Sequence, residues 1–115
     1  MTQSAIFPDD ENGDVLRRMA SHGDNLAAPR NVDFEHIFPS IEAALAFTAE
    51  VVNRTDTVSV NWYDELSSWN VRVTRHMTPT HQGVTELELS LDQVARKHGG
   101  KADGWGCMQV DANDS

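Results

Sequence analysis

The amino-acid sequence predicts a single α+β domain. Apolar residues alternate at the spacing of a half-buried strand in four segments and recur at helical spacing in three others. These segments follow one another as helix, strand, helix, strand, strand, helix and strand. With 115 residues, the chain is long enough for one hydrophobic core and too short for two ordinary domains. The last six segments have the order of a ferredoxin-like βαββαβ sandwich, with a four-stranded antiparallel sheet and an additional N-terminal helix.

The additional helix is predicted over residues 8–22. Asp9, Asp10 and Glu11 stand at its start, where carboxylates interact favourably with the helix dipole, and Gly23 follows its end. Residues 31–38 then alternate in the manner of a strand, with His36 on the apolar side. Residues 40–54 are predicted to form a helix that covers the sheet. The residues of its apolar stripe, which recur at helical spacing, are Ile41, Ala44, Leu45, Thr48, Val51 and Val52.

Two neighbouring strands are predicted next, at residues 57–63 and from Trp69 onward, joined by a short polar hairpin loop. A long helix is expected from Pro79 or Thr80 to His98, and a last strand over residues 102–110. The domain therefore spans residues 8–110. Residues 1–7 are expected to form a flexible N-terminus and residues 111–115 a disordered acidic tail.

Charge and cysteine content narrow the classes of function. The formal net charge is −9, which disfavours nonspecific binding to nucleic acid and makes a basic protein segment the more natural partner. The single cysteine excludes an intrachain disulfide. No membrane span or export signal is apparent, so a cytoplasmic location is expected.

Candidate chemistry is sparse, and neither a cofactor nor a metal is expected. His76 and His81 flank a turn and form a metal site only if Asp103 approaches them, while Cys107 is interpreted as a structural strand residue. RNA-recognition domains bind bases by stacking them on aromatic side chains of an open sheet face. The first strand instead carries Asp33 and Glu35 on that face, so direct RNA binding by it is not expected.

The junction between the last helix and the last strand carries four glycines around one tryptophan. Gly99 is expected to end the helix in a left-handed conformation. Gly104 and Gly106 are expected to permit close backbone approach beside a core tryptophan. The characteristic residues of this junction are Gly99, Gly100, Asp103, Gly104, Trp105 and Gly106.

Three blocks of sequence together resemble a bacterial family, the regulator of ribonuclease activity B, or ribonuclease E inhibitor family. The blocks are residues 29–34 with Phe38 and Pro39, residues 69–79, and the glycine and tryptophan junction. The resemblance implies a non-enzymatic cytoplasmic protein that binds ribonuclease E, in its scaffold region, and alters RNA cleavage by protein contact. It implies no catalytic residue.

The leading hypothesis is that an acidic surface binds a basic segment of ribonuclease E. The residues predicted to contribute to this surface are Asp9, Asp10, Glu11, Asp33 and Glu35. The alternative is a regulatory module that binds a small molecule or forms a dimer, because ferredoxin-like domains often pair through their sheets. A third hypothesis, an enzyme using His76, His81 or Cys107, predicts a bound metal or a reactive thiol. The sequence does not decide between monomer and homodimer.

Overall fold

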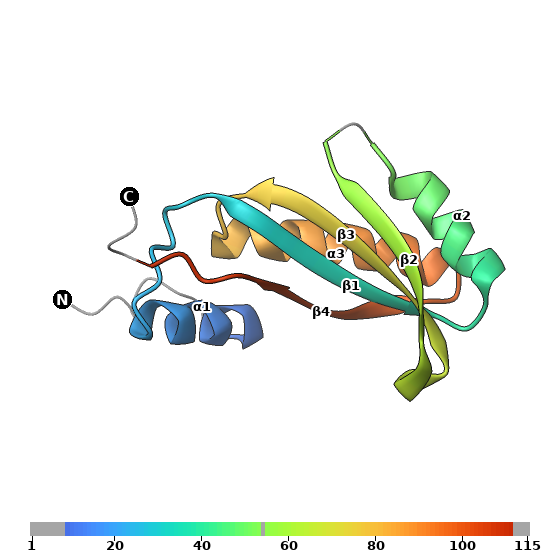
Figure 1. The fold of residues 1–115 in the computed structure, drawn as a ribbon, viewed down its shortest axis with the longest axis horizontal. Helices are drawn as coiled ribbons and strands as arrows, with labels where there is room; N and C mark the ends of the chain where they lie inside the picture. The colour runs from blue at the N-terminus through green and yellow to red at the C-terminus, as the bar shows by residue number, and fades with distance from the viewer. Residues whose placement is uncertain (1–8, 54, 112–115) are drawn as a thin grey trace.

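The computed structural model describes residues 9–53 and 55–111, so the predicted N-terminus over residues 1–7 and most of the predicted tail lie outside the described residues. Three α-helices and a four-stranded antiparallel sheet form an α+β fold (Figure 1). In chain order the elements are α1 (Glu11–Ser21), β1 (Arg30–Phe38), α2 (Ile41–Val51), β2 (Thr57–Tyr63), the 3-10 turn η2 (Asp64–Leu66), β3 (Ser68–Met77), α3 (His81–Lys97) and β4 (Lys101–Cys107).

The strands lie in the order β2-β3-β1-β4, which places β1 and β3 at the centre and β2 and β4 at the two edges. β1 pairs antiparallel with both β3 and β4, and β2 pairs antiparallel with β3. The predicted elements are all present. The last strand, however, ends at Cys107, three residues before the predicted end.

The core lies between one face of the sheet and helices α2 and α3. Alternate residues of β1, among them Val32, Phe34 and Phe38, are buried there against Phe47 of α2 and Val84 of α3. Because side chains in a strand alternate between faces, the other residues of β1 point away from this core. The alternation that predicted this strand therefore also predicted its buried face correctly.

His36 belongs to the buried face, as expected. Its side chain is almost fully enclosed, its ring lies 4.9 Å from that of Phe47, and Nδ1 is 3.3 Å from the carbonyl oxygen of Val71. Burial lowers the pKa of His36 because the charged imidazolium loses its hydration. His36 is therefore a buried packing residue whose neutral form the fold favours.

Helix α2 differs in one respect from its predicted packing. Its apolar stripe was expected to include Leu45, but Leu45 is exposed, and Ala44 and Phe47 are the buried residues. The helix is apolar on more than one side, so periodicity alone did not indicate which side faces the sheet. The rings of Phe38 and Phe47, 5.0 Å apart, show which side does.

Helix α1, whose position the sequence left open, docks on the helical side of the sheet. The Asp10 side chain caps it by accepting a hydrogen bond from the Gly13 amide at 2.7 Å. The Asn12 side chain joins three elements. It donates to Thr85 and Glu88 of α3 and accepts a 2.8 Å hydrogen bond from the indole nitrogen of Trp105 in β4.

The glycines of the junction agree with the prediction at Gly99 but not at Gly104 and Gly106. Gly99 has the expected positive φ, +80°, after α3. Close approach occurs at Gly100, where a Cβ atom would stand 2.4 Å from the Phe38 ring. A Cβ atom at Gly104 or Gly106 would meet no neighbour within 4 Å, so the expectation of close approach there was wrong. Trp105 is half-buried at the edge of the core.

Candidate interaction surface

Within the described residues, no helix packs on the second face of the sheet. Helices α2 and α3 supply the core on the first face, and α1 bonds to Trp105, which also points to that side. The second face, here called the uncovered face, carries the alternate residues of β1 and their antiparallel partners in β3. Asp33 stands opposite Thr74, and Glu35 opposite Arg72. Because polar side chains occupy these central positions, the uncovered face is suited to contact with water or a polar partner.

The carboxylates at the centre of the uncovered face are held by their neighbours on β3. Arg72 Nε lies 2.7 Å from one oxygen of Glu35, and the Asn70 amide donates to the other oxygen at 3.1 Å. The Thr74 hydroxyl donates to Asp33 at 2.6 Å. These hydrogen bonds restrict the rotamers of both carboxylates, which lowers the conformational entropy that a partner has to remove on binding.

A β-bulge places a third carboxylate beside them. Phe34 pairs with Trp105 and His36 pairs with Ala102, so Asp103 and Gly104 together stand opposite the single residue Glu35. Gly104 has a φ of +102°, a conformation that an L-residue with a side chain rarely adopts. Gly104 thus permits the bulge, and the bulge places Asp103 next to Glu35 on the uncovered face.

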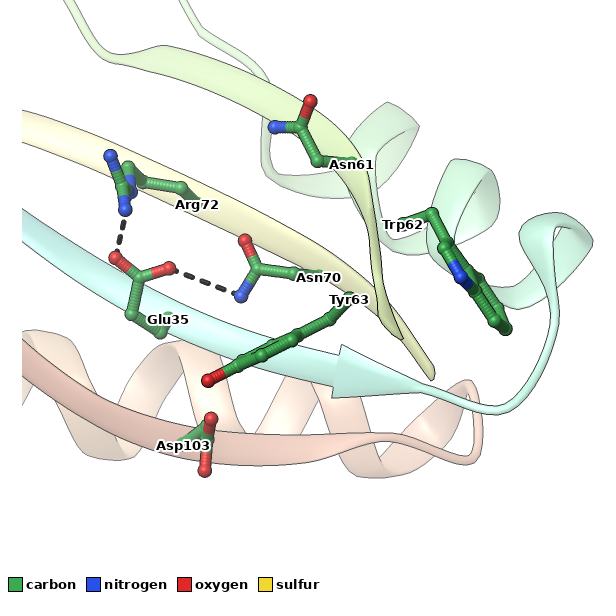
Figure 2. A pocket seen from close by; sticks show the side chains of 7 residues that line it. All are labelled: Glu35, Asn61, Trp62, Tyr63, Asn70, Arg72 and Asp103. Atoms are coloured by element: carbon green, nitrogen blue, oxygen red, sulfur yellow. Dashed lines mark hydrogen bonds and ion pairs between the residues drawn. The ribbon is translucent and has the colours of Figure 1, made fainter. Parts of the chain in front are cut away.

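An open hollow of about 520 Å³ lies between these groups (Figure 2). The side chain of Tyr63 extends from the end of β2 across the hollow toward Asp103, and Arg72, Asn70 and Glu35 lie along its other side. The residues that line the hollow are Glu35, Asn61, Trp62, Tyr63, Asn70, Arg72 and Asp103. Aromatic, carboxylate and amide groups therefore meet at one place on the uncovered face.

The acidic residues predicted at the start of α1 lie elsewhere. Asp10 caps α1, and its carboxylate is 2.9 Å from Nε2 of His81 on α3. Hydrogen bonds from the Gly13 amide and from His81 lower the pKa of Asp10. Asp9 and Glu11 are exposed next to it. Since α1 packs on the helical side, this acidic group and the pair Asp33 and Glu35 do not form one continuous surface.

The residues of the metal and nucleophile hypotheses are likewise separated. His76 is 3.2 Å from the Asn31 side chain on the uncovered face, whereas His81 bonds to Asp10 on the helical side. No group of three potential metal ligands occurs among the described residues. Cys107 is half-buried at the end of β4, and burial raises the pKa of its thiol, which lowers its reactivity.

One buried polar site was not predicted from the sequence. Arg30 is the first residue of β1, and its guanidinium lies 2.8 Å from the carboxylate of Asp24, with both side chains at most 5% exposed. The same guanidinium donates to the carbonyl oxygens of Asn25, Ala28 and Met108. The signal in the sequence is an arginine at the start of an apolar alternating segment. Because charged residues are rarely buried unless they are paired, such an arginine indicates a buried carboxylate nearby.

Comparison with known protein families identifies the fold's relatives. The family model for regulator of ribonuclease activity B (RraB) matches residues 9–107. The chain belongs to the RraB family. The resemblance carried by the three sequence blocks is thus confirmed, and the match includes every helix and strand from α1 to β4. No individual curated protein matches at a significant level. RraB is a family of regulators, and the described part of this member has no helix long and apolar enough to cross a membrane.

Proposed function

We propose that this RraB family member binds ribonuclease E through the uncovered face and inhibits or modulates RNA cleavage by protein contact. Membership of a family of ribonuclease regulators supports the regulatory part of the proposal. The observation that carries the binding part is that Glu35 and Asp103 line the open hollow, with Asp33 beside them, on a sheet face that no described helix covers. A basic segment of the ribonuclease scaffold is the complementary partner.

The chemistry of the hollow favours arginine within that segment. The ring of Tyr63 offers a face on which a guanidinium can stack, and Asp103 and Glu35 offer carboxylates for charge-assisted hydrogen bonds. The overall charge of −9 attracts a basic segment at long range and repels the phosphates of RNA. The proposed regulator therefore acts on the enzyme rather than on its substrate, and without catalysis of its own.

We also propose that the last six elements are a ferredoxin-like sandwich and that the protein acts in the cytoplasm. The order β2-β3-β1-β4, with β1 antiparallel to both neighbours, supports the first statement. The core shared by α2, α3 and one sheet face supports it as well. Membership of a family of ribonuclease regulators supports the second statement, because the resemblance to that family implies a cytoplasmic protein.

The test is binding of purified ribonuclease E scaffold to a variant whose uncovered face has lost two charges. Asp33→Asn combined with Glu35→Gln retains the shape of both side chains and removes the charge. We expect the dissociation constant to rise about tenfold or more at low salt, and the salt dependence of binding to decrease. Isothermal titration calorimetry at two ionic strengths measures both quantities.

The matched control is Asp9→Asn combined with Glu11→Gln, which removes the same charge from the helical side. Both residues are exposed, so the fold should be unaffected, and binding should change less than twofold. Equal weakening by the two variants would show that only net charge matters. Unchanged binding by the Asp33 and Glu35 variant, with native thermal unfolding, would refute the assignment of the uncovered face.

A further inference from the structure

The two edges of the sheet differ in how they are protected against pairing with another strand. β4 carries the bulge at Asp103 and Gly104, a charged residue at Lys101, and α1 lies on its side of the molecule (Figure 1). β2 pairs with β3 at seven consecutive positions without a shift and contains no charged residue and no proline. Edge strands are usually blunted by such features. β2 is therefore an edge open to strand addition.

An apolar flank of α2 lies on the same side of the molecule as β2. α2 packs on β1, β2 and β3, whereas α3 packs on β1 and β4. Glu50 faces α3, because its carboxylate is 2.5 Å from Lys97 Nζ and 2.9 Å from His98 Nε2. At about 100° per residue, Ile41 and Leu45 lie roughly 180° and 140° around the helix from Glu50. This flank therefore points away from α3, toward the open edge.

The exposure of the apolar residues agrees with this geometry. Leu45 is 53% exposed, and Trp62 near the end of β2 is 50% exposed although it points to the core side of the sheet. Val58 and Val60 of β2 are only half-buried. A surface of this kind in a soluble chain favours an apolar partner rather than a basic one, since β2 offers no carboxylate.

We propose that β2 and the flank of α2 formed by Ile41 and Leu45 are the interface of a homodimer with two-fold symmetry. Antiparallel pairing of β2 with β2 of a second copy, centred on Val60, sets Val58 against Trp62 and Ser59 against Asn61. Apolar side chains then meet apolar ones and polar meet polar, with no charge opposed along the strand. The last pair within the two strands would be Thr57 and Tyr63, and beyond it Asp56 would stand opposite Asp64. Asp56 already forms an ion pair with Arg75, whose Nε and Nη2 each lie 2.9 Å from a carboxylate oxygen of Asp56.

Two-fold symmetry explains why a second copy suits this surface better than an isolated peptide strand. The operation that joins the two β2 edges makes one continuous sheet with all helices on one face, and it brings the two α2 flanks toward each other. A single added strand would pair with β2 but would bring no apolar helix flank to cover Leu45. The proposal is independent of ribonuclease binding, because the uncovered face stays free in such a dimer.

The dimer is tested by placing charged residues on the β2 edge and measuring dimer dissociation by sedimentation equilibrium of the full chain. Ser59 and Asn61 are exposed, and each would stand opposite the other across the two-fold axis. S59K/N61K and S59E/N61E should each raise the dimer dissociation constant at least tenfold, because like charges meet at two positions. An equimolar mixture of the two variants should dimerise again. Near-ultraviolet circular dichroism verifies that both are folded.

The control is Q82K/S90K, which adds two lysines at exposed positions of α3 and should leave the dimer unchanged. The dimer proposal is overturned if the unmodified chain sediments as a monomer, or as a larger assembly, throughout its soluble range. It is also overturned if the dimer persists in both charged variants, or if their mixture stays monomeric. No ribonuclease is present in this experiment, so its result is separate from that of the binding test.

Discussion

Neighbouring residues of β1 belong to two different environments. Phe34 is buried against α2 and α3, whereas Asp33 and Glu35 on either side of it bond to polar side chains of β3 on the uncovered face. The first environment supplies most of the free energy of folding, because it removes apolar surface from water. The second supplies little stability, because half-exposed ion pairs contribute about 0 to 1 kcal/mol. Stability and the proposed recognition can therefore be changed separately by substitutions one residue apart.

The largest effect is expected from a cavity on the covered face. Phe47→Ala removes a fully buried ring that contacts both His36 and Phe38. The free energy of unfolding should fall by about 3 to 5 kcal/mol, as measured by urea denaturation. Leu89→Ala, at an exposed position of α3, is the control and should change it by less than about 0.5 kcal/mol. Similar losses for both would contradict the assigned core.

A smaller loss is expected at the junction. In Gly100→Ala, the new methyl group would stand 2.4 Å from the Phe38 ring and 2.6 Å from the carbonyl oxygen of Ile37, so the strand end has to shift. Overpacking of this kind costs about 1 to 3 kcal/mol. The same substitution at Gly106, where the methyl group meets nothing within 4 Å, should cost clearly less. Thermal unfolding of both variants measures the difference.

The buried histidine should make stability depend on pH. Burial lowers the pKa of His36 in the folded chain, although the carboxylates of Asp92 and Glu35 oppose this shift. The unfolded chain therefore binds a proton first, and stability present above the unfolded pKa of about 6.5 is lost as pH falls below it. For the native chain, the urea concentration at half unfolding should decrease from about pH 7.5 to about pH 5, the range in which histidine titrates.

His36→Phe separates this effect from other titrations. The variant should show a smaller decrease over the same pH range, because no group then titrates at that position. His76→Gln, which changes an exposed histidine on the uncovered face, should retain the native dependence. Identical pH profiles for His36→Phe and the native chain would show that another group is responsible.

The smallest change is expected from the ion pair on the uncovered face. Arg72→Ala removes the 2.7 Å contact with Glu35, but both side chains are partly exposed, so the free energy of unfolding should decrease by about 1 kcal/mol or less. The proposed binding of ribonuclease E should not weaken, because Arg72 no longer competes with a basic partner for the Glu35 carboxylate. A loss as large as that of Phe47→Ala would mean that the two faces are not separable.

Much of the covered face could be predicted from the sequence, because strand alternation is a local property. Val32, Phe34 and His36 were placed on the buried side by periodicity alone. Leu45 was misplaced because α2 is apolar on more than one side, and only the neighbouring sheet determines which side is buried. Local pattern is sufficient when one face is clearly polar and insufficient when both are apolar.

The uncovered face was harder to predict because it is assembled from separate strands. Asp33 and Glu35 were identified from one strand, but the hollow also needs Tyr63 from β2 and the bulge that accompanies Asp103 in β4. The acidic start of α1 was grouped with them by charge alone, and tertiary packing put it on the other side. Pairing between distant segments decides such proximity, and one sequence does not contain the register.

The Arg30 site has a consequence for the rate at which the protein unfolds. Its guanidinium joins the loop before β1, through Asp24 and Asn25, to the carbonyl of Met108, 78 residues further along the chain. We expect contacts between such distant segments to form after the central strands have paired, and so to be absent from the transition state for folding. Interactions of this type slow unfolding while leaving the folding rate unchanged. We therefore expect the Arg30 contacts to slow the release of the segment around Met108 from the assembled sheet.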